Sequence, residues 1–266
     1  MKNFLINFLS KNFFRNIRNF LLIKPTFSLK PQNSKYTISD FFYWNQDNGF
    51  STKFMLTNLS SQAYPDDNDI DYIKIIIFNN NGLKIKSISY ELNPFQTIDL
   101  LFQDLNVSGY GSFCVFHKFN KLNDIILKNS FMAERGYVGY KTNLGVWNFM
   151  HGNKYACYLN DKNNIKSILS SSLYKFSYLP QVSFLDCKKT SIILNNPTKK
   201  NVKYMIKFFD SNNIIIKSNT YNISEFGTLE LSVEYKTAYV NIISNLLLSR
   251  PIIIKKYKTY FDIFHG

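Results

Sequence analysis

Two stretches of the chain resemble each other at a constant spacing, and this internal repeat limits the possible folds more than any other feature. Residues 73–82 resemble residues 204–213, since each stretch is an apolar run that ends in an Asn-rich turn. The spacing of about 131 residues is then kept without a gap through 83–100 and 214–231. We therefore expect a chain of two related halves.

Apolar residues alternate with other residues in both copies, as they do in strands with one buried face. The alternating residues are Ile73, Ile75 and Ile77 in the first copy and Tyr204, Ile206 and Phe208 in the second. Asn81-Gly82 is typical of a tight hairpin turn, which needs positive φ angles. Aromatic residues make up 17% of the chain and hydrophobic residues 45%, which favours β structure around a core. We predict equivalent antiparallel hairpins in which Ile75 and Ile206 are buried.

A corner of the pattern leucine-x-proline-x-x-threonine follows the first hairpin at 92–97, and 223–228 repeats it without the proline. An Asn-rich hairpin followed by this corner resembles a class of bacterial Ig-like modules of surface or carbohydrate-associated proteins. The resemblance implies a mainly β fold of two tandem antiparallel β-sandwich (Ig-like) repeats, preceded by an N-terminal amphipathic helix. It implies binding modules and no particular reaction.

These observations divide the chain into four predicted segments. They are a basic leader over 1–33, a first β-sandwich over 34–152, a linker over 153–177 and a second β-sandwich over 178–266.

Residues 1–24 have the pattern of a basic amphipathic helix that ends before Pro25. Its apolar run is interrupted too often to span a bilayer, and no signal-peptide cleavage site follows it. The segment is therefore a helix on an anionic membrane surface, an organellar targeting peptide, or a helix that docks on the protein itself or on a partner. We expect a membrane-peripheral or cytoplasmic location.

The net charge of +14 is unevenly distributed, because the residues before Asp40 include seven Lys or Arg and no acid. Nucleic-acid binding therefore rests on charge alone and is the least favoured function. Cys114, Cys157 and Cys187 lie far apart without a CxxC spacing, which predicts packed thiols and neither a zinc site nor a disulfide framework.

Arg135 with His151 and Arg250 with His265 occupy matching positions in the two copies, although the chain has only three His. In one interpretation each pair forms an anion pocket, where the guanidinium holds a carboxylate or phosphate and the imidazole donates a hydrogen bond or acts as a base. In the other, each Arg bonds to strand-end carbonyls and each His-Gly pair closes a last strand.

Trp44 and Trp147, together with Tyr43 and Tyr140, could form an aromatic platform for sugars or bases, or pack inside the core. Asp67, Asp69 and Asp71 are spaced like the start of a calcium loop, but the expected Gly and the later Glu are missing. A solvated loop is the simpler interpretation of these acids, and weak calcium binding is the alternative.

The sequence contains none of the common catalytic motifs, neither a Gly-rich phosphate loop nor GxSxG or HExxH. Cys114 and His117 are three residues apart, so in a strand they would face opposite sides. We therefore predict a non-enzymatic binding or structural protein without a cofactor, which recognises a glycan or a protein surface near a membrane. The alternatives are an enzyme acting on an acidic sugar or polysaccharide and a nucleic-acid-binding protein.

Overall fold

The computed structural model describes most of the chain from residue 35 onward. The described residues are 13–14, 17, 21, 35–47, 49–66, 68–120, 133–134, 136–143, 145–167, 171–187, 189–233, 236–246 and 250–266. Apart from four single residues, the leader helix predicted over 1–24 lies outside this part of the chain. No helix within the described residues is long and apolar enough to cross a membrane.

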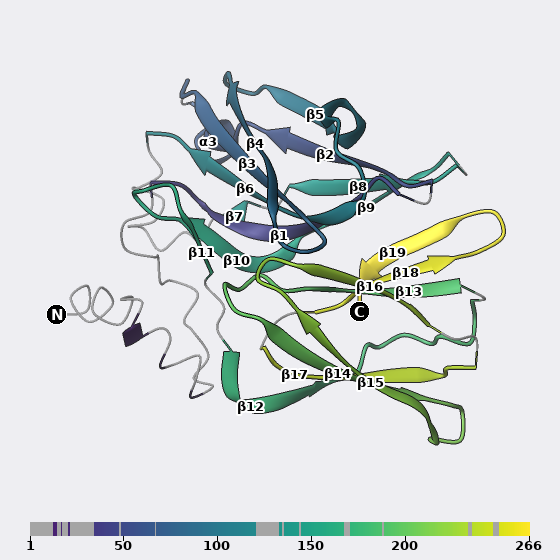
Figure 1. Cartoon of the computed structure of the whole chain (residues 1–266). Helices are drawn as coiled ribbons and strands as arrows, with labels where there is room; N and C mark the ends of the chain where they lie inside the picture. Colours follow the sequence, from purple (N-terminus) through teal and green to yellow (C-terminus); the bar gives the residue numbers. More distant parts are fainter. Residues whose placement is uncertain are drawn as a thin grey trace.

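Nearly all described elements are strands, as predicted (Figure 1). The first half, residues 35–167, contains β1 (Ile38–Asn45), β2 (Ser51–Thr57), β3 (Asp71–Asn79), β4 (Lys84–Leu92), β5 (Thr97–Leu101), β6 (Tyr110–Lys118), β7 (Ala133–Glu134), β8 (Tyr137–Lys141), β9 (Trp147–Met150), β10 (Asn153–Leu159) and β11 (Ile165–Ser167). It also holds the short helix α3 (Leu59–Ala63) and the 3₁₀ turn η1 (Phe102–Leu105). The second half, residues 171–266, contains β12 (Ser171–Tyr178), β13 (Lys189–Asn195), β14 (Val202–Phe209), β15 (Ile215–Ile223), β16 (Thr228–Val233), β17 (Tyr239–Leu246), β18 (Ile252–Lys256) and β19 (Phe261–His265).

The strands form four sheets, which we call A to D. Sheet A has the order β11-β10-β1-β6-β3-β4, with β7 paired in parallel to β1, and sheet B has the order β5-β2-β8-β9. Sheet C has the order β12-β17-β14-β15, and sheet D has the order β16-β13-β18-β19. The segment expected to be a linker, 153–177, contains β10 and β11 of sheet A and most of β12 of sheet C.

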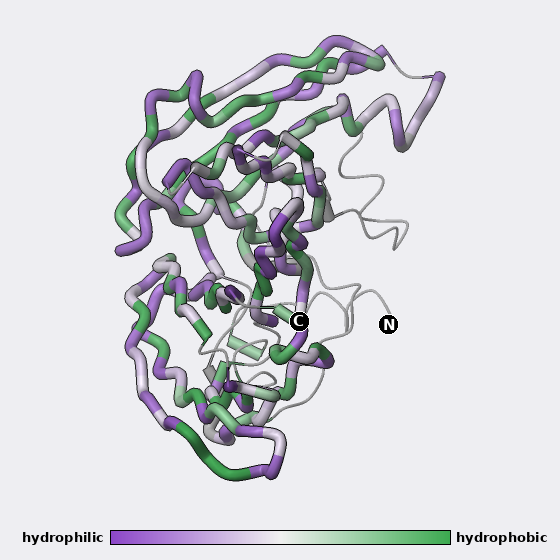
Figure 2. Tube along the Cα trace, turned by 90° about the vertical axis from the view of Figure 1, so that its right-hand side faces the viewer, coloured by the Kyte–Doolittle hydropathy of each residue, from purple (hydrophilic) through white to green (hydrophobic). Residues whose placement is uncertain are grey.

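The two predicted hairpins are confirmed as equivalent. Ile73 lies opposite Tyr90 in the pair β3–β4, and Tyr204 lies opposite Tyr221 in the pair β14–β15. Ile75 and Ile206 are both fully buried, as predicted. Hydrophobic and hydrophilic residues alternate along many of the strands (Figure 2), which is the pattern from which the strands were predicted.

The prediction of two tandem Ig-like β-sandwiches is wrong. The structure has four small sheets, the number of sheets in a four-bladed propeller, although the strands of each sheet are not consecutive in the chain as successive blade repeats would make them. In an Ig domain the first strand joins the sheet of the second, and the last strand joins the sheet of the sixth. In the second half the first strand, β12, instead pairs with the sixth, β17, and the seventh strand, β18, pairs with the second, β13. Local patterns identified the hairpins, but they do not specify where the first and last strands pair.

Sheet D also joins the two halves, because apolar residues cover both of its faces. Ile192 and Ile253 belong to the core that it forms with sheet C, whereas their neighbours Ile193 and Ile252 belong to the core of the first half. Consecutive residues of a strand point to opposite faces, so a continuous apolar run marks a strand buried on both sides. Sheet D therefore connects the hydrophobic cores of the two halves.

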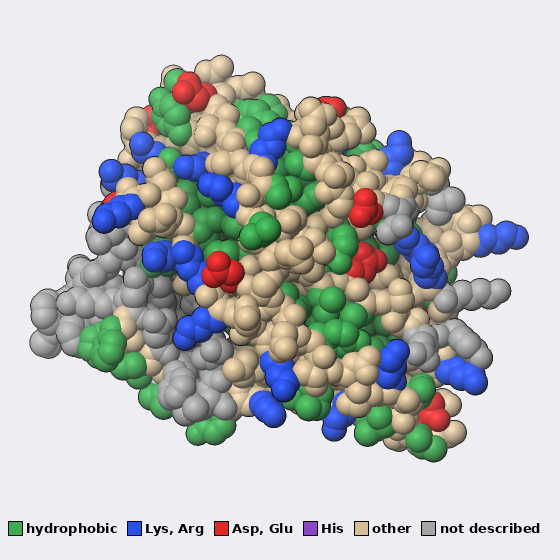
Figure 3. All heavy atoms as spheres, viewed as in Figure 1, with side chains coloured by type: hydrophobic (Ala, Val, Ile, Leu, Met, Phe, Trp, Pro, Cys, Tyr) green, Lys and Arg blue, Asp and Glu red, His purple; other side chains and the backbone are tan. Residues whose placement is uncertain are grey.

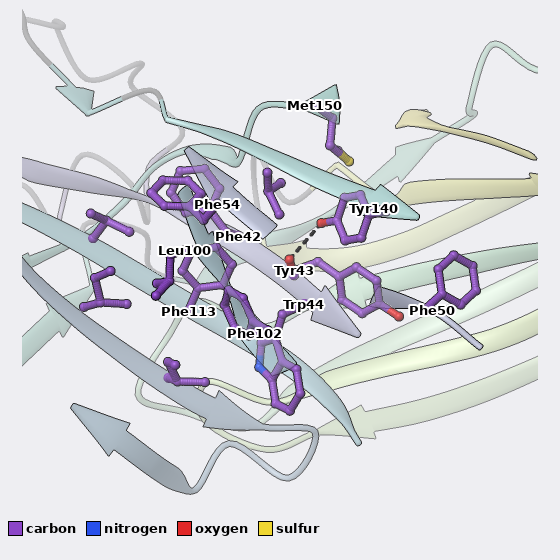
Figure 4. Close-up of a cluster of buried hydrophobic side chains, with 14 of the residues drawn as sticks. Phe42, Tyr43, Trp44, Phe50, Phe54, Leu100, Phe102, Phe113, Tyr140 and Met150 are labelled. Carbon is purple, nitrogen blue, oxygen red and sulfur yellow. Dashed lines mark hydrogen bonds between the residues drawn. The ribbon is translucent and has the colours of Figure 1, made fainter. Parts of the chain in front are cut away.

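Aromatic side chains fill the first core between sheets A and B (Figure 4). Phe42 stacks on Phe113 with ring centroids 4.9 Å apart and meets Phe54 edge-on at 4.8 Å. Farther along, Phe50 meets Phe261 of β19 edge-on at 5.5 Å, which continues the core into the second half. The three cysteines are buried and free, as predicted for packed thiols.

Candidate functional site

The outer face of sheet B carries a group of aromatic and cationic side chains. Residues of β2 alternate between buried and partly exposed, so Lys53 points outward while Thr52 and Phe54 point into the core. In the same register, Lys53 lies beside Gly139 of β8, which in turn lies beside Phe149 of β9. The regular pairing of three strands thus places one cation and one aromatic ring in a single row.

Gly139, which has no side chain, allows the Phe149 ring to approach Lys53. A Cβ atom at this position would lie 2.6 Å from the ring of Phe149, closer than a real Cβ contact allows. Without a side chain at Gly139, the Phe149 ring lies across β8 towards Lys53. The Lys53 ammonium is 5.3 Å from the centre of the Phe149 ring and 5.0 Å from that of Trp147, within the range of a cation–π interaction.

The neighbouring row adds a second cation. Lys141 pairs with Trp147 across β8 and β9, and its ammonium is 6.0 Å from the centre of the indole ring. On the other side, Tyr137 is 51% exposed, and its ring is tilted by 42° against that of His151 with centroids 4.8 Å apart. We call Lys53, Tyr137, Lys141, Trp147 and Phe149 the sheet B platform.

The acidic group beside the platform is Asp99 of β5, whose carboxylate lies 3.3 Å from the Lys53 ammonium. Half of the Asp99 side chain is exposed, so this ion pair is worth little for stability. Lys53 is therefore held by two aromatic rings and by one carboxylate.

A cleft of about 170 Å³ lies where the turn after β8 approaches the tip of the β18–β19 hairpin. Thr142 and Asn143 line one side, and Lys256, Tyr257 and Tyr260 line the other. The two tyrosine rings are stacked, with centroids 4.4 Å apart. The cleft thus gathers aromatic, amide and cationic groups next to the end of β8, where Lys141 of the platform directly precedes Thr142. Another cleft, of about 260 Å³, lies over β3 and β4 of sheet A.

Of the two predicted platform tryptophans, only Trp147 reaches the surface. Trp44 is fully buried, donates its indole N–H to the carbonyl of Phe78 over 2.8 Å, and stacks on Phe102 (Figure 4). Tyr140 is buried as well and donates its hydroxyl to the carbonyl of Tyr43. The four aromatic residues named from the sequence therefore do not form one surface.

Of the two predicted Arg–His pairs, the structure describes both members of the second pair only, and there Arg250 lies close enough to His265 for its charge to act on the imidazole. Arg135 lies outside the described residues. His265 contacts His151 of the other half, since its Nε2 lies 3.0 Å from the His151 carbonyl oxygen. Burial lowers the pKa of His265 to about 4, and the positive charge of Arg250 adds to this effect. His265 is therefore neutral at pH 7 and donates its Nε2–H to that carbonyl.

The aspartates of the predicted calcium loop bond to protein groups. Asp67 lies outside the described residues, and Asp69 accepts hydrogen bonds from the backbone N–H and the side-chain amide of Asn120. Asp71 is fully buried and accepts the backbone N–H of Leu59 over 2.8 Å. Within the described part of the chain, no group of three His, Cys, Asp or Glu side chains is placed to hold a metal ion.

Asp71 also contacts His117, with Oδ2 and Nδ1 2.6 Å apart and both side chains fully buried, and sequence reasoning missed this pair. The alternation of buried residues could have revealed it. Asp71 lies two residues before Ile73, and His117 lies two residues after Val115, so both side chains point to the same face of their strands as these core residues. Because the pair is closed off from solvent, it connects β3 and β6 and cannot reach a dissolved substrate. Cys114 faces the opposite side of β6, as predicted, where burial raises its pKa well above the usual value.

No protein-family model matches the chain, and no curated protein matches it. Among solved structures, the chain is similar to a β-glucuronidase from glycoside hydrolase family 2, at 10% sequence identity and a TM-score of 0.17. The match covers 86% of this chain but only 23% of that enzyme. Because the TM-score is so low, the similarity supports no argument about fold or function.

Proposed function

We propose that this protein is a binding protein for acidic glycans and that the sheet B platform holds the sugar without changing it chemically. The observation that carries the proposal is the placement of Trp147 and Phe149 beside two ammonium groups on one face of sheet B. Partly exposed rings on a sheet offer apolar faces on which a sugar ring can stack.

The cations favour an acidic sugar. Lys53 and Lys141 both lie near the Trp147 ring, so a sugar stacked there would bring its carboxylate close to one or both ammonium groups. Such a contact is a charge-assisted hydrogen bond, which is stronger than a bond between neutral groups. Asp99 would repel the same carboxylate, so the acid group should face Lys141.

The arrangement of carboxyl groups beside the platform favours binding without catalysis. Hydrolysis of a glycosidic bond normally requires two carboxyl groups on opposite sides of the bond. Among the described residues that make up the platform and its edge, Asp99 is the acid in contact, and it is paired with Lys53. The described part of the site therefore fits a sugar-binding surface better than a hydrolase active site.

The test compares two probes with the same backbone, polygalacturonate oligosaccharides and their fully methyl-esterified forms, by isothermal titration calorimetry. We expect the wild-type protein to prefer the acid. Trp147→Ala should weaken binding of both probes at least about fivefold, because one stacked ring contributes about 1–3 kcal/mol. Lys141→Met should remove the preference for the acid and leave binding of the ester nearly unchanged.

Tyr174→Ala is the matched control, since Tyr174 is an exposed aromatic residue on β12 of sheet C. It should bind both probes as the wild type does. Thermal melts of all variants should be similar, because the substituted side chains are partly or largely exposed. Unchanged binding in Trp147→Ala, or no binding of either probe by the wild type, would contradict the proposal.

A further inference from the structure

The two halves meet at a contact between a hairpin tip and a corner. The tip of the β3–β4 hairpin, residues 79–83, lies against the corner between β15 and β16, residues 224–227 (Figure 1). Thr228 donates its backbone N–H to the carbonyl of Asn80 over 2.9 Å, and Ser224 donates its hydroxyl to the carbonyl of Asn81 over 2.6 Å.

Phe226 supplies the apolar part of this contact. Its ring is 5% exposed and stacks on Phe78 of β3, with centroids 4.8 Å apart and an interplanar angle of 20°. Ser112 pairs with Phe78 across β6 and β3, and its small side chain donates to the Phe226 carbonyl. The backbone of Phe226 has a φ of 54°, which is rare for a bulky residue. This strained corner is thus held in place by the stacking of the Phe226 ring on Phe78 and by the hydrogen bond from Ser112.

The tip must be small for the corner to approach so closely. A Cβ at Gly82 would overlap the carbonyl oxygen of Glu225, at 1.7 Å. The contact therefore requires two features of the hairpin, an aromatic ring at Phe78 and a glycine at Gly82, and a small residue at Ser112 on the neighbouring strand β6.

The first half repeats the corner, whose backbone bonds to Ser61 and Asn58, but its aromatic ring is left exposed. Phe95 corresponds to Phe226 at the repeat spacing, and it has the same unusual backbone with a φ of 60°. Its ring is 63% exposed, and the backbone hydrogen bond from Gln96 to Asn93 closes the same turn as that from Gly227 to Ser224. The fold thus presents a second copy of a corner that, in its other copy, binds a hairpin tip.

The second half also repeats the hairpin tip, but there the binding site is closed. Phe209 corresponds to Phe78, and the residue paired with it across the sheet is Tyr239, where Phe78 has Ser112. The Tyr239 ring stacks on Phe209 at 4.6 Å, in the role that Phe226 has on Phe78.

Asn213 closes the same tip from its other side. It takes the place of Gly82 and keeps a positive φ of 64°, but its side chain would obstruct a corner that approached as closely as 224–227 does. The Tyr239 hydroxyl donates to Asn213 Oδ1 over 3.1 Å, so the two blocking residues hold each other in place.

We propose that the Phe95 corner, residues 93–96, is a docking site for the hairpin tip of another β-module, and that Tyr239 and Asn213 prevent this chain from serving as its own partner. The partner carries an aromatic ring, a small residue and a glycine at the places of Phe78, Ser112 and Gly82. Without the two blocking residues, tip and corner of successive copies would form a head-to-tail contact, which leads to rings or filaments. This inference does not depend on the glycan proposal.

The test opens the closed tip and measures the molecular mass by analytical ultracentrifugation over a range of concentrations. The wild-type chain should remain a monomer. The double variant Asn213→Gly/Tyr239→Ser should associate, and its average mass should rise with concentration. Adding Phe95→Asn to the double variant should restore the monomer, because Asn tolerates the positive φ of this corner but lacks the ring.

Val146→Asn in the double variant is the matched control, since it replaces a side chain that is 55% exposed outside the tip and the corner, and it should leave association unchanged. If Tyr239→Ser impairs folding, as circular dichroism would show, Asn213→Gly/Tyr239→Ala replaces it as the opened variant. A folded opened variant that stays monomeric would refute the docking site. Association of the wild type that depends on Phe95 would refute the blocking role, and association that persists in Phe95→Asn would place the contact elsewhere.

Discussion

His265 is a residue whose protonation the fold controls strongly. Its pKa is lowered from 6.5 to about 4, because burial removes water from the imidazolium and because Arg250 adds positive charge. The unfolded chain therefore binds a proton at this residue below about pH 6.5, whereas the folded chain does so only near pH 4. We predict that this residue makes the free energy of unfolding fall by roughly 1–3 kcal/mol as the pH drops from 6.5 to 4, with no change above that window.

Urea unfolding of the wild type and of His265→Gln at a series of pH values measures this effect. Gln retains an N–H that can donate to the His151 carbonyl but does not titrate between pH 4 and 7. The difference in unfolding free energy between the two proteins should therefore change across the window and be constant above pH 7. Parallel curves over the whole range would show that His265 is readily protonated in the folded protein.

The two tryptophans show what the sequence could predict about single residues. Trp44 follows Phe41-Phe42-Tyr43 in a strand that is buried on both faces, so no alternation of polar and apolar residues reveals which way its side chain points. Trp147 belongs to a short strand of sheet B, where it is partly exposed. Because its neighbours on the platform come from other strands, the sequence order alone could not bring Lys53 and Trp147 together.

At the scale of elements, each half contains a buried asparagine that connects the loop after one strand to the end of another. Asn196 donates to the carbonyls of Lys200, Ile223 and Ser224 over 2.7–3.0 Å. Asn58, its counterpart, donates to the carbonyl of Leu92 over 2.9 Å, and both asparagines are fully buried.

We predict that Asn196→Ala lowers the free energy of unfolding by about 2–4 kcal/mol, because it leaves buried carbonyls without a donor. Asn58→Ala should have an effect in the same range. Asn219→Ala is the control, since its amide donates to a Tyr221 hydroxyl that is only partly buried, and it should cost less than about 0.5 kcal/mol. Chemical denaturation monitored by circular dichroism measures all three. A loss in Asn196→Ala no larger than in the control would contradict the proposed structural role.

The elements also show where prediction from the sequence stops. The pairing of β3 with β4 and of β14 with β15 is local, and both turns carry residues that accept positive φ, Gly82 and Asn213. These hairpins and their register could therefore be predicted. The partners of β1 and β12 lie far away in the sequence and are chosen by core packing, so the Ig-like topology inferred from local patterns was wrong.

At the scale of the whole molecule, sheet D connects the two cores, and we predict that the halves unfold as one cooperative unit. Both tryptophans lie in the first half, so their fluorescence reports on that half, whereas circular dichroism reports on both. Ile253→Ala removes a fully buried side chain from the core of the second half, which should cost about 2–5 kcal/mol. The fluorescence midpoint should move to lower denaturant together with the circular dichroism midpoint.

The control for this prediction is Ile214→Ala, which truncates a side chain that is 62% exposed at the β14–β15 tip and should move neither midpoint. Figure 3 shows exposed hydrophobic side chains around this tip, at the lower right of the view. If Ile253→Ala shifts the circular dichroism signal while fluorescence stays unchanged, the halves unfold independently and sheet D does not couple them.

The contact between the β3–β4 tip and the corner at Phe226 also has a consequence for synthesis of the chain. The ribosome makes Phe41 and Phe78 long before it makes Phe226, whose ring covers them in the finished protein. During that interval the nascent chain displays an aromatic surface next to an Asn-rich tip, which is the kind of transiently exposed surface that makes unfinished chains aggregate and that chaperones bind. Fragments that end before Ser224 would keep this surface open permanently, so production of the first half alone should require a chaperone where the full chain does not.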